Sequence, residues 1–213
     1  MTALLDATNN WLLNIDDGLP NGIIFLDLKK AFDTMDHGIL LEKLKLYGVN
    51  QSSLCWFSSY LSEREQRTFV DGALSDNYKI KCGIPQGSIL GPLFFIIYIN
   101  DLPSCDLYST VRMYADDTSL TIAHSDENIL EQRMNHDLCE INTWLIANRL
   151  SLNVVKTKYM IVASKHKIKQ LDHNFQIKVN QQLLKRERTY KYLGVEIDES
   201  LTWGHQIEKI DAQ

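Results

Sequence analysis

The sequence has few of the features found in secreted, membrane-spanning or zinc-binding proteins. Its 213 residues include only four cysteines. They form no Cys-x-x-Cys pair and have no matching histidine spacing, which argues against a disulfide framework and a structural zinc site. The longest apolar run, residues 93–99, is far shorter than the roughly 20 residues of a membrane span. The N-terminus also lacks a signal peptide pattern. We therefore expect an intracellular protein, nuclear or cytoplasmic, that is not secreted and has no membrane partner.

Charge is moderate in total but uneven along the chain. The formal net charge is −5, and 45% of the residues are hydrophobic, which is typical of a globular chain with a core and of about one domain. Residues 165–191 nevertheless carry eight Lys or Arg side chains and only two acidic ones. This segment either contacts a polyanion or forms a solvated lysine-rich hairpin, and charge alone does not decide between them.

The spacing of apolar residues predicts a mixed fold. Helices are expected over residues 3–16, 39–47, 54–61 and 88–102, and along a stripe formed by Leu130, Met134, Leu138, Ile141 and Leu145. Strands are expected over residues 22–28, 66–70, 78–82, 111–114, 119–122, 159–162, 175–179 and 190–197. Ser125 is suited to cap the long helix, and helix 88–102, apolar on almost every side, should be buried. The predicted class is α+β, with an antiparallel sheet covered by helices on one side.

Acidic residues occur at two places where apolar strands end. Asp27 lies within the apolar run 22–28, where an ionised carboxylate is costly to bury unless it is paired or metal-bound. The alternative is that Asp27 reaches solvent or caps the next helix. Asp116 and Asp117 lie where two predicted strands turn, and acidic residues are common in turns because their side chains bond to the local backbone. Each place therefore has an ordinary explanation when it is considered alone.

Taken together, the three acids point to metal chemistry. If the strand before Asp27 pairs with the strand after Asp117, the carboxylates of Asp27, Asp116 and Asp117 converge, and their mutual repulsion requires cations. Mg²⁺ binds few protein carboxylates and completes its shell with water and phosphate oxygens. Two such ions, roughly 3.5–4 Å apart, suit in-line phosphoryl transfer. This arrangement predicts nucleotidyl transfer.

A loop rich in glycine lies between these two places, with the sequence Gly83-Ile84-Pro85-Gln86-Gly87-Ser88. Its two glycines allow close approach of the backbone to a ligand, and Ser88 can cap the helix that follows. The alternative is a strand-to-helix turn that needs glycine only for its dihedral angles.

Five segments resemble the ordered motifs of reverse transcriptases. Residues 25–33 (FLDLKKAFD), 83–88 (GIPQGS) and 114–117 (YADD) resemble motifs A, B and C. Residues 150–158 (LSLNVVKTK) resemble motif D, and residues 192–195 (YLGV) resemble motif E. The first three are most similar to those of non-LTR, LINE-like retrotransposon enzymes. The resemblance covers about residues 22–197 and implies an RNA-directed DNA polymerase, a nucleotidyltransferase.

The resemblance implies a two-metal site built from three carboxylates. Asp27 and Asp116 would hold both Mg²⁺ ions, for which Mn²⁺ can substitute. Asp117 would be the third carboxylate, and the Leu28 carbonyl a further ligand. Lys156 would lie near the pyrophosphate as a charge neutraliser or proton donor, the alternative being a solvated lysine.

The other motifs imply contacts with substrates. Phe32 would pack under the incoming sugar and select dNTPs by clashing with a ribose 2′-hydroxyl, the alternative being a core aromatic. Gln86 would touch the incoming nucleotide or the template, and Gly87 would leave room for the base pair. The primer grip would be formed by Tyr192, Leu193 and Gly194. The implied partners are an RNA template, a DNA primer and a dNTP, and cations such as those of residues 165–191 would contact the phosphates.

The resemblance also implies a domain organisation. Residues 1–213 would form a single, partial reverse transcriptase domain with a palm-type antiparallel sheet. Residues 1–34 and 83–200 would belong to the palm, and residues about 35–82 to the fingers. The N-terminal fingers and the C-terminal thumb of relatives have no counterpart here, which is expected to weaken substrate binding because catalysis of this kind depends on positioning.

Two other functions remain as alternatives to polymerisation of DNA on RNA. The first is a non-catalytic relic, or a nucleic-acid-binding module with the palm fold. The second is another palm-type nucleotidyltransferase, such as an RNA-templated RNA polymerase or a cyclase, against which Phe32 argues because it would disfavour ribonucleotides. The sequence indicates neither the template and target specificity nor the oligomeric state.

Overall fold

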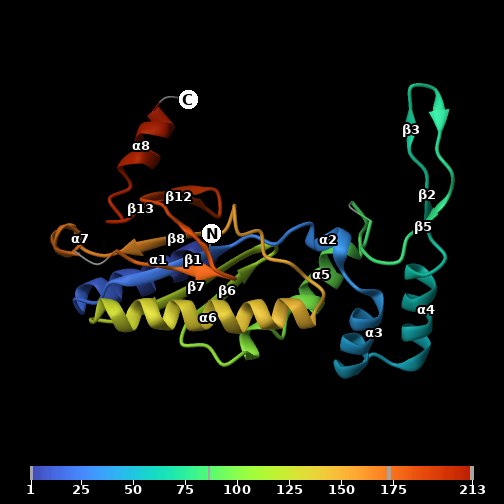
Figure 1. The fold of residues 1–213 in the computed structure, drawn as a ribbon, viewed down its shortest axis with the longest axis horizontal. Helices are drawn as coiled ribbons and strands as arrows, with labels where there is room; N and C mark the ends of the chain where they lie inside the picture. Colours follow the sequence, from blue (N-terminus) through green and yellow to red (C-terminus); the bar gives the residue numbers. More distant parts are fainter. Residues whose placement is uncertain (1, 86, 172–173, 212–213) are drawn as a thin grey trace. The chain divides into compact units, whose positions relative to one another are not determined.

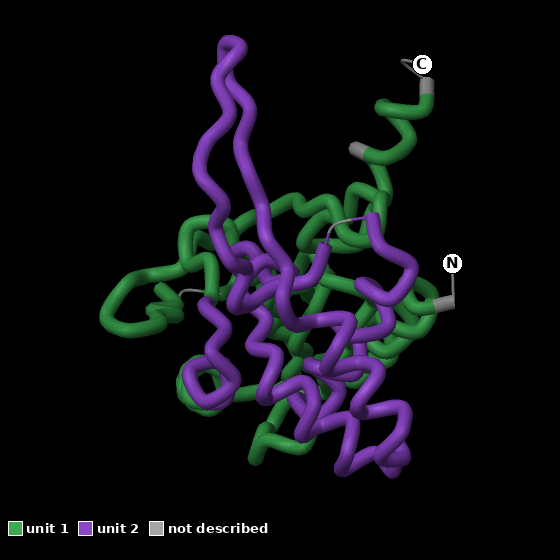
Figure 2. Tube along the Cα trace, turned by 90° about the vertical axis from the view of Figure 1, so that its right-hand side faces the viewer, with its two compact units in different colours: residues 1–28, 103–143, 152–213 green, residues 29–102, 144–151 purple. Residues whose placement is uncertain are grey.

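The computed structural model describes residues 2–85, 87–171 and 174–211. The chain divides into two compact units: unit 1 contains residues 1–28, 103–143 and 152–213, and unit 2 contains residues 29–102 and 144–151 (Figure 2). The assignment of these units to palm and fingers stays a prediction. Within the described residues, no helix is both long enough and apolar enough to cross a membrane.

Unit 1 is built on a five-stranded sheet. Its strands, in spatial order, are β11 (Lys185–Arg186), β8 (Lys158–Val162), β1 (Asn21–Leu26), β7 (Asp117–Ala123) and β6 (Thr110–Tyr114). All neighbouring pairs are antiparallel except β11 and β8, which are parallel. The predicted antiparallel sheet is therefore confirmed, with one parallel strand added at its edge.

Strand β1 lies in the middle of this sheet. It pairs with β7 on one side, where Leu26 aligns with Thr118, and with β8 on the other, where Ile23 aligns with Met160. All six of its residues are buried. A strand that is buried on both faces has no reason to alternate polar and apolar residues, which explains the continuous apolar run in the sequence.

Helices cover both faces of the sheet in unit 1, so the prediction of one covered face was wrong. Helix α6 (Glu127–Ala147) packs directly on β1, because a Cβ at Gly22 would lie 2.4 Å from the sulfur of Met134. Helix α1 (Thr2–Asp16) lies on the other face, where the Trp11 indole donates a 3.0 Å hydrogen bond to Thr121 Oγ1. Trp11 also shares a buried core with Ile23.

In the long helix α6 the predicted apolar stripe is confirmed, but the predicted capping residue is wrong. The five stripe residues are at most 1% exposed: Leu130, Met134, Leu138, Ile141 and Leu145. The side chain of Asp126, and not that of Ser125, accepts hydrogen bonds from the N–H groups of Asn128 and Ile129. A carboxylate at this position also interacts favourably with the helix dipole.

The rest of unit 1 consists of short elements around the sheet (Figure 1). They are α7 (Lys165–Gln170), β9 (Lys178–Val179), β10 (Gln182–Leu183), β12 (Thr189–Tyr192), β13 (Val195–Asp198) and α8 (Gly204–Asp211). The strand predicted over residues 190–197 is a hairpin of β12 and β13. The strand predicted over residues 175–179 is shorter, because only β9 at its end pairs with a neighbour. A short 3-10 helix, η1 (Leu102–Ser104), spans the change from unit 2 to unit 1.

Unit 2 contains helices and a long hairpin. The helices are α2 (Ala31–Thr34), α3 (His37–Leu46), α4 (Gln51–Leu61) and α5 (Gly91–Ile99). Helix α5 is shorter than predicted and is buried on one side only, because Leu93 and Ile96 are 49% and 51% exposed. Ser88 does accept a hydrogen bond from the first N–H of α5, that of Gly91, at 3.1 Å.

The strands predicted over residues 66–70 and 78–82 belong to a long hairpin of unit 2. Strands β3 (Phe69–Val70) and β4 (Ala73–Leu74) pair across Asp71-Gly72, and β2 (Glu65–Gln66) pairs with β5 (Tyr78–Lys79) further along. All four strands are exposed. We call these four strands and their connections, residues 64–80, the ribbon.

Candidate active site

The backbone of Asp27 is held from both sides immediately after β1. Its N–H donates to Thr157 Oγ1 at 3.1 Å, and its carbonyl accepts from the N–H of Asn153 at 2.7 Å. The next residue, Leu28, forms an antiparallel bridge with Leu152. The segment that resembles motif D therefore fixes the backbone from which the Asp27 carboxylate projects.

Asp116 and Asp117 lie at the hairpin between β6 and β7. Tyr114 pairs with Asp117, which leaves a loop of two residues, Ala115 and Asp116, where a four-residue turn was predicted. Ala115 has a φ of +53°, as the tightest hairpin loops require. A residue with a Cβ pays roughly 1–2 kcal/mol for this conformation, so the local backbone is strained next to the acids.

The strand register brings Asp27 and Asp117 to the same end of the sheet. Because Leu26 aligns with Thr118, Asp27 and Asp117 come next to each other at the ends of paired strands. Partial burial raises the pKa of Asp117, and the carboxylates of Asp116 and Asp27 raise it further. The pairing of β1 with β7, on which the predicted acidic cluster depended, is present.

The carboxylates at this end of the sheet are suitable ligands for a hard cation. Carboxylate oxygens are the ligands that Mg²⁺ prefers, and their mutual repulsion is relieved by a divalent ion. Within the described residues, however, no group of three or more His, Cys, Asp or Glu side chains is gathered closely enough to hold a metal ion. Asp116 is exposed and Asp117 is only partly covered, and the carboxylates of Asp116 and Asp27 act on Asp117 through their charges without forming such a group. Their role as metal ligands stays a prediction.

Two tyrosines of strand β12 cover the sheet beside these acids. The ring of Tyr190 stacks on that of Phe25, with centroids 3.9 Å apart and planes 9° apart. Burial raises the pKa of Tyr190, and the carboxylates of Asp117 and Asp27 raise it further. Tyr190 was not predicted to belong to the site, although its alternation with Tyr192 in TYKY is typical of two rings that face the same side of a strand.

The residues predicted to form the primer grip lie in the β12–β13 hairpin. Tyr192 is 4% exposed, and its hydroxyl is 2.9 Å from Ser119 Oγ. Leu193 and Gly194 form the two-residue loop, with φ values of +48° and +87°. The Tyr192 ring is therefore part of the core, and the loop and the hairpin backbone are the parts that a nucleic acid can reach.

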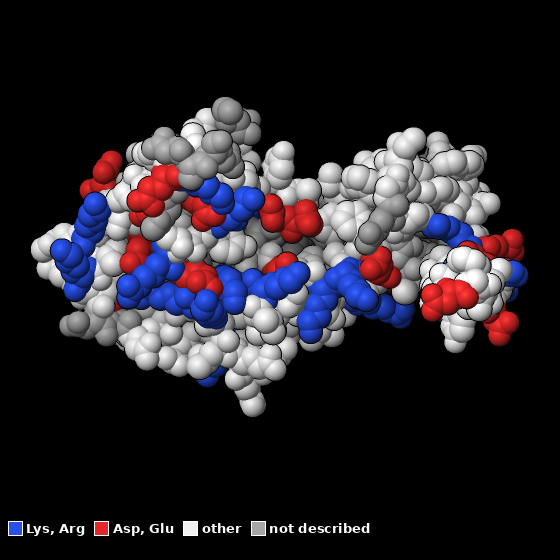
Figure 3. Space-filling view, turned by 90° about the horizontal axis from the view of Figure 1, so that it is seen from above, with Lys and Arg blue, Asp and Glu red and all other residues white. Residues whose placement is uncertain are grey.

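A cavity of about 470 Å³ opens beside Asp27. Lys156, Lys158 and Lys191 line it together with Asp27 and Tyr190. Lys156 was predicted to lie near the pyrophosphate, Lys191 belongs to the segment 165–191 that was predicted to contact phosphates, and Lys158 was given no role of its own. Figure 3, which views the molecule from the side on which Figure 1 draws β12 and β13, shows lysine and arginine side chains interspersed with acidic ones. Because charges of both signs are mixed on this side of the molecule, the net charge of the sequence does not reveal the lysines around the cavity.

The other predicted site residues belong to unit 2. The Phe32 ring is partly exposed and stacks on Phe95, with centroids 4.7 Å apart. The Phe32 carbonyl accepts from the N–H of Ile84 at 2.8 Å, so the start of the motif B segment is attached to α2. A Cβ at Gly83, which has a φ of +82°, would lie 2.5 Å from the Asp33 carbonyl oxygen, so only glycine fits there.

The second glycine of this loop, Gly87, has a φ of +81° and has open space where a Cβ would lie. The loop therefore needs glycine at position 87 for the positive φ, and not because a side chain would clash with unit 2. Gln86, which was predicted to touch the nucleotide or the template, lies outside the described residues.

The chain is similar to known reverse transcriptases. The sequence model of the family described as reverse transcriptase (RNA-dependent DNA polymerase) matches residues 8–197. The RNA-directed DNA polymerase from the mobile element jockey of Drosophila melanogaster is 28% identical over 193 residues, which are 87% of this chain and 20% of that protein. The probable RNA-directed DNA polymerase from transposon BS of the same species is 27% identical over 94% of this chain and 22% of that protein.

Solved structures of telomerase share the fold. The structure of telomerase from Candida albicans in complex with a TWJ fragment of telomeric RNA matches 94% of this chain and 34% of that chain, with a TM-score of 0.61 and 17% identity. The chain thus spans about a third of that structure and about a fifth of the curated relatives. The predicted α+β class and the predicted family are confirmed. Because the family model matches most of its length, the chain belongs to the reverse transcriptase (RNA-dependent DNA polymerase) family and is related to the enzymes of non-LTR mobile elements.

Proposed function

We propose that this chain is the catalytic core of an RNA-directed DNA polymerase of a non-LTR retrotransposon. It would transfer nucleotides from dNTPs to the 3′-hydroxyl of a primer on an RNA template. The observation that carries the proposal is the pairing of β1 with β7, which brings Asp27 beside Asp117 and the strained turn with Asp116. The family match over residues 8–197 includes all three acids. We further propose that the protein acts inside the cell, in the nucleus or the cytoplasm.

The three acids would hold the metal ions of this reaction. Two divalent ions, Mg²⁺ or Mn²⁺, would activate the attacking hydroxyl and stabilise the leaving oxygen. Asp27 and Asp116 would ligate both ions, and Asp117 and the Leu28 carbonyl would complete the set. The raised pKa of Asp117 follows from burial and from its acidic neighbours, which is the electrostatic condition that a bound cation relieves.

The remaining site residues would position the substrates on a palm-type sheet. Lys156, in the cavity beside Asp27, would neutralise charge on the pyrophosphate or donate a proton to it. Phe32 would exclude ribonucleotides, while Gln86 and Gly87 would contact the nascent base pair. The hairpin loop at Leu193 and Gly194, with Tyr192 beneath it, would support the primer end.

The grip on the template and primer would come from phosphate contacts. Residues 165–191 supply cationic side chains, of which Lys165 and Lys169 on α7 and Lys191 on β12 are exposed. Such contacts give affinity without sequence preference and weaken as the salt concentration rises. A hybrid of RNA and DNA would be recognised mainly by its backbone shape and its 2′-hydroxyls.

A primer-extension assay on an RNA template tests this function. We expect Mg²⁺-dependent incorporation of dNTPs by the chain and loss of incorporation in Asp116→Asn, which keeps the size of the side chain but removes its charge. Asp106→Asn, at an exposed acid outside the site, is a matched control that should keep full activity. Equal incorporation by the Asp116→Asn variant and the unaltered chain would exclude catalysis through this site.

A second candidate function is a non-catalytic nucleic-acid-binding module with the same fold. The observation that favours it is that the three acids do not gather into a metal-binding group within the described part of the chain. Binding of a template-primer without any Mg²⁺-dependent synthesis would support this alternative. Synthesis above the background of the Asp116→Asn variant would exclude it.

A further inference from the structure

The base of the ribbon in unit 2 is formed by paired strands. Here the antiparallel pairing is continuous: Glu65 aligns with Lys79, Gln66 aligns with Tyr78, and the N–H of Ile80 donates to the Arg64 carbonyl at 2.8 Å. Alternate residues of such a ladder project to opposite sides. The ribbon therefore has two distinct faces at its base, even though both are exposed to solvent.

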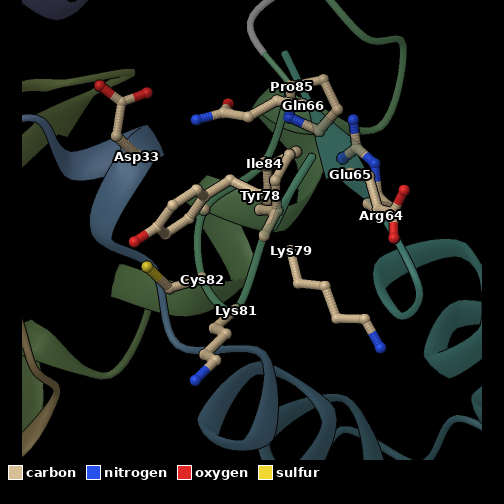
Figure 4. Close-up of a pocket in the computed structure, with 12 residues that line it drawn as sticks. Asp33, Arg64, Glu65, Gln66, Tyr78, Lys79, Lys81, Cys82, Ile84 and Pro85 are labelled. Atoms are coloured by element: carbon tan, nitrogen blue, oxygen red, sulfur yellow. The ribbon is translucent and has the colours of Figure 1, made fainter. Parts of the chain in front are cut away.

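A cavity of about 870 Å³ lies at this base (Figure 4). It is lined by residues 64–66 and 78–82 of the ribbon and its continuation, by Asp33, and by residues 83–85. This volume falls within the range of about 300–1,000 Å³ that is typical of ligand sites. Residues 83–85 begin the glycine-rich loop, so the cavity is continuous with the predicted nucleotide-binding segment within the same unit.

The lining of this cavity carries cationic groups that are free to bind anions. Arg64, Lys79 and Lys81 take part in no ion pair within the described portion of the chain. Lys79 ends β5 and Lys81 follows two residues later, and Figure 4 shows both side chains extending into the lower part of the view with their amino groups apart. The acid closest to them in the ladder, Glu65, accepts a 2.6 Å hydrogen bond from the Asn77 side chain instead.

An exposed aromatic ring adds a second kind of contact. Tyr78 is 78% exposed and points to the side of Asp33, away from Lys79 (Figure 4). A tyrosine this exposed contributes little to a core. Sites for unpaired nucleic acid usually combine aromatic rings, on which bases stack, with cationic side chains, which contact the phosphates.

We infer that this cavity binds a single-stranded segment of nucleic acid, with Lys79 and Lys81 on its phosphates and Tyr78 stacked on one of its bases. The base must be unpaired, because a base within a duplex is already stacked on both of its faces. The identification of this strand as the RNA template rests on the proposed function, and follows from the continuity of the cavity with residues 83–85. The binding itself is measured independently of polymerisation.

Salt-dependent binding tests the role of the lysines. The probe is a 12-nucleotide RNA without secondary structure, labelled with fluorescein, and the full chain is titrated in EDTA without dNTP. Each phosphate contact contributes about 0.7 to the slope of log K against log salt for single strands. We expect the double variant Lys79→Gln, Lys81→Gln to bind several-fold more weakly and to lower this slope by about 1.4. Lys45→Gln, at an exposed lysine of α3 outside the cavity, should change neither quantity.

Two substitutions of Tyr78 test whether an RNA base stacks on its ring, independently of any effect on folding. Tyr78→Ala should weaken binding of the RNA by about fivefold or more, whereas Tyr78→Phe keeps the ring and should bind normally. Both variants should have the far-UV circular dichroism of the unaltered chain. A matched duplex of the same length should bind equally to Tyr78→Ala and to the unaltered chain, because its bases are not available to the ring.

Three outcomes would overturn the inference: an unchanged salt slope in the lysine double variant, equal RNA binding by Tyr78→Ala and the unaltered chain, or displacement of the RNA by a dNTP, which would make the cavity a triphosphate site. Primer extension is measured separately with Asp116→Asn. If the unaltered chain shows no synthesis above the Asp116→Asn background but its RNA binding still depends on Tyr78, only the proposed function is rejected. If synthesis depends on Asp116 but RNA binding does not depend on Tyr78, only this inference is rejected.

Discussion

The hydroxyl of Thr157 should control the position of Asp27. Thr157 is fully buried, and its oxygen accepts the N–H of Asp27 at 3.1 Å. Thr157→Val replaces the hydroxyl by a methyl group of similar volume and leaves this N–H without its partner. A buried donor that loses its acceptor costs about 1–3 kcal/mol. At a typical urea dependence of about 2 kcal/mol per molar, we expect the unfolding midpoint to fall by about 0.5–1.5 M.

The same substitution should affect catalysis more than binding. Asp27 would keep the Asn153 contact to its carbonyl, but the backbone from which its carboxylate projects would no longer be held from both sides. Small displacements of a catalytic group cost up to about 100-fold in rate, so we expect kcat for primer extension to fall about tenfold or more with little change in KM for dNTP.

A matched substitution separates the hydroxyl from side-chain shape. Thr157→Ser keeps the acceptor and loses only a methyl group, so it should retain most of the kcat and lose stability only through the small cavity. Equal kcat for Thr157→Val and the unaltered chain would refute the idea that this hydrogen bond positions Asp27. A loss of kcat in Thr157→Ser as large as that in Thr157→Val would refute it as well.

Three further substitutions test the structure around the site by urea unfolding. Asp126→Ala should destabilise the chain by about 1 kcal/mol because it removes the cap of α6, whereas Ser125→Ala should have no measurable effect; the reverse order would contradict the observed cap. Gly83→Ala should cost more than about 1 kcal/mol, since its φ is +82° and its Cβ would overlap the backbone of α2; an unchanged midpoint would show that the loop can relax. Burial acts to raise the pKa of Asp198, but three backbone N–H groups and the Thr202 hydroxyl lower it below its ordinary value. Its stabilisation should therefore be present above the ordinary aspartate pKa of about 4 and be lost as the pH falls through the lowered pKa of Asp198. Asp198→Asn should be about 2 kcal/mol less stable at pH 7 and should lack this part of the pH dependence.

Much of unit 1 could be predicted from apolar periodicity. The stripe of α6 and the buried run of β1 are both strong signals, because one face of a helix and both faces of a central strand must be apolar. The sequence does not distinguish Ser125 from Asp126 as the cap of α6, since serine and aspartate are both good caps, and only the hydrogen bonds to Asp126 separate them. The second covered face could not be predicted, because periodicity shows that α1 has an apolar side but not which side of the sheet receives it.

The acidic residues of the candidate site could be predicted from the sequence, but the residues that position them could not. Asp27 and the pair Asp116 and Asp117 stand out as charges beside apolar strands, and the motif resemblance names them. Thr157 and Tyr190 carry no such signal, because a buried hydroxyl and an inward-facing ring are common in any core. Their roles follow from contacts between segments that are about 130 and 165 residues apart in the sequence, Asp27 with Thr157 and Phe25 with Tyr190, and no local pattern encodes these contacts.

The central position of β1 also limits how the length of this strand can change in related chains. Side chains alternate between the two faces of a strand, so inserting or deleting one residue between Asn21 and Asp27 would turn the carboxylate toward the α6 side of the sheet. Neighbouring strands on both sides leave no free edge where a bulge could absorb the change. Under the proposed function, such a single-codon change should abolish primer extension even when every motif residue is still encoded, whereas changes of length at the tip of the ribbon should be tolerated.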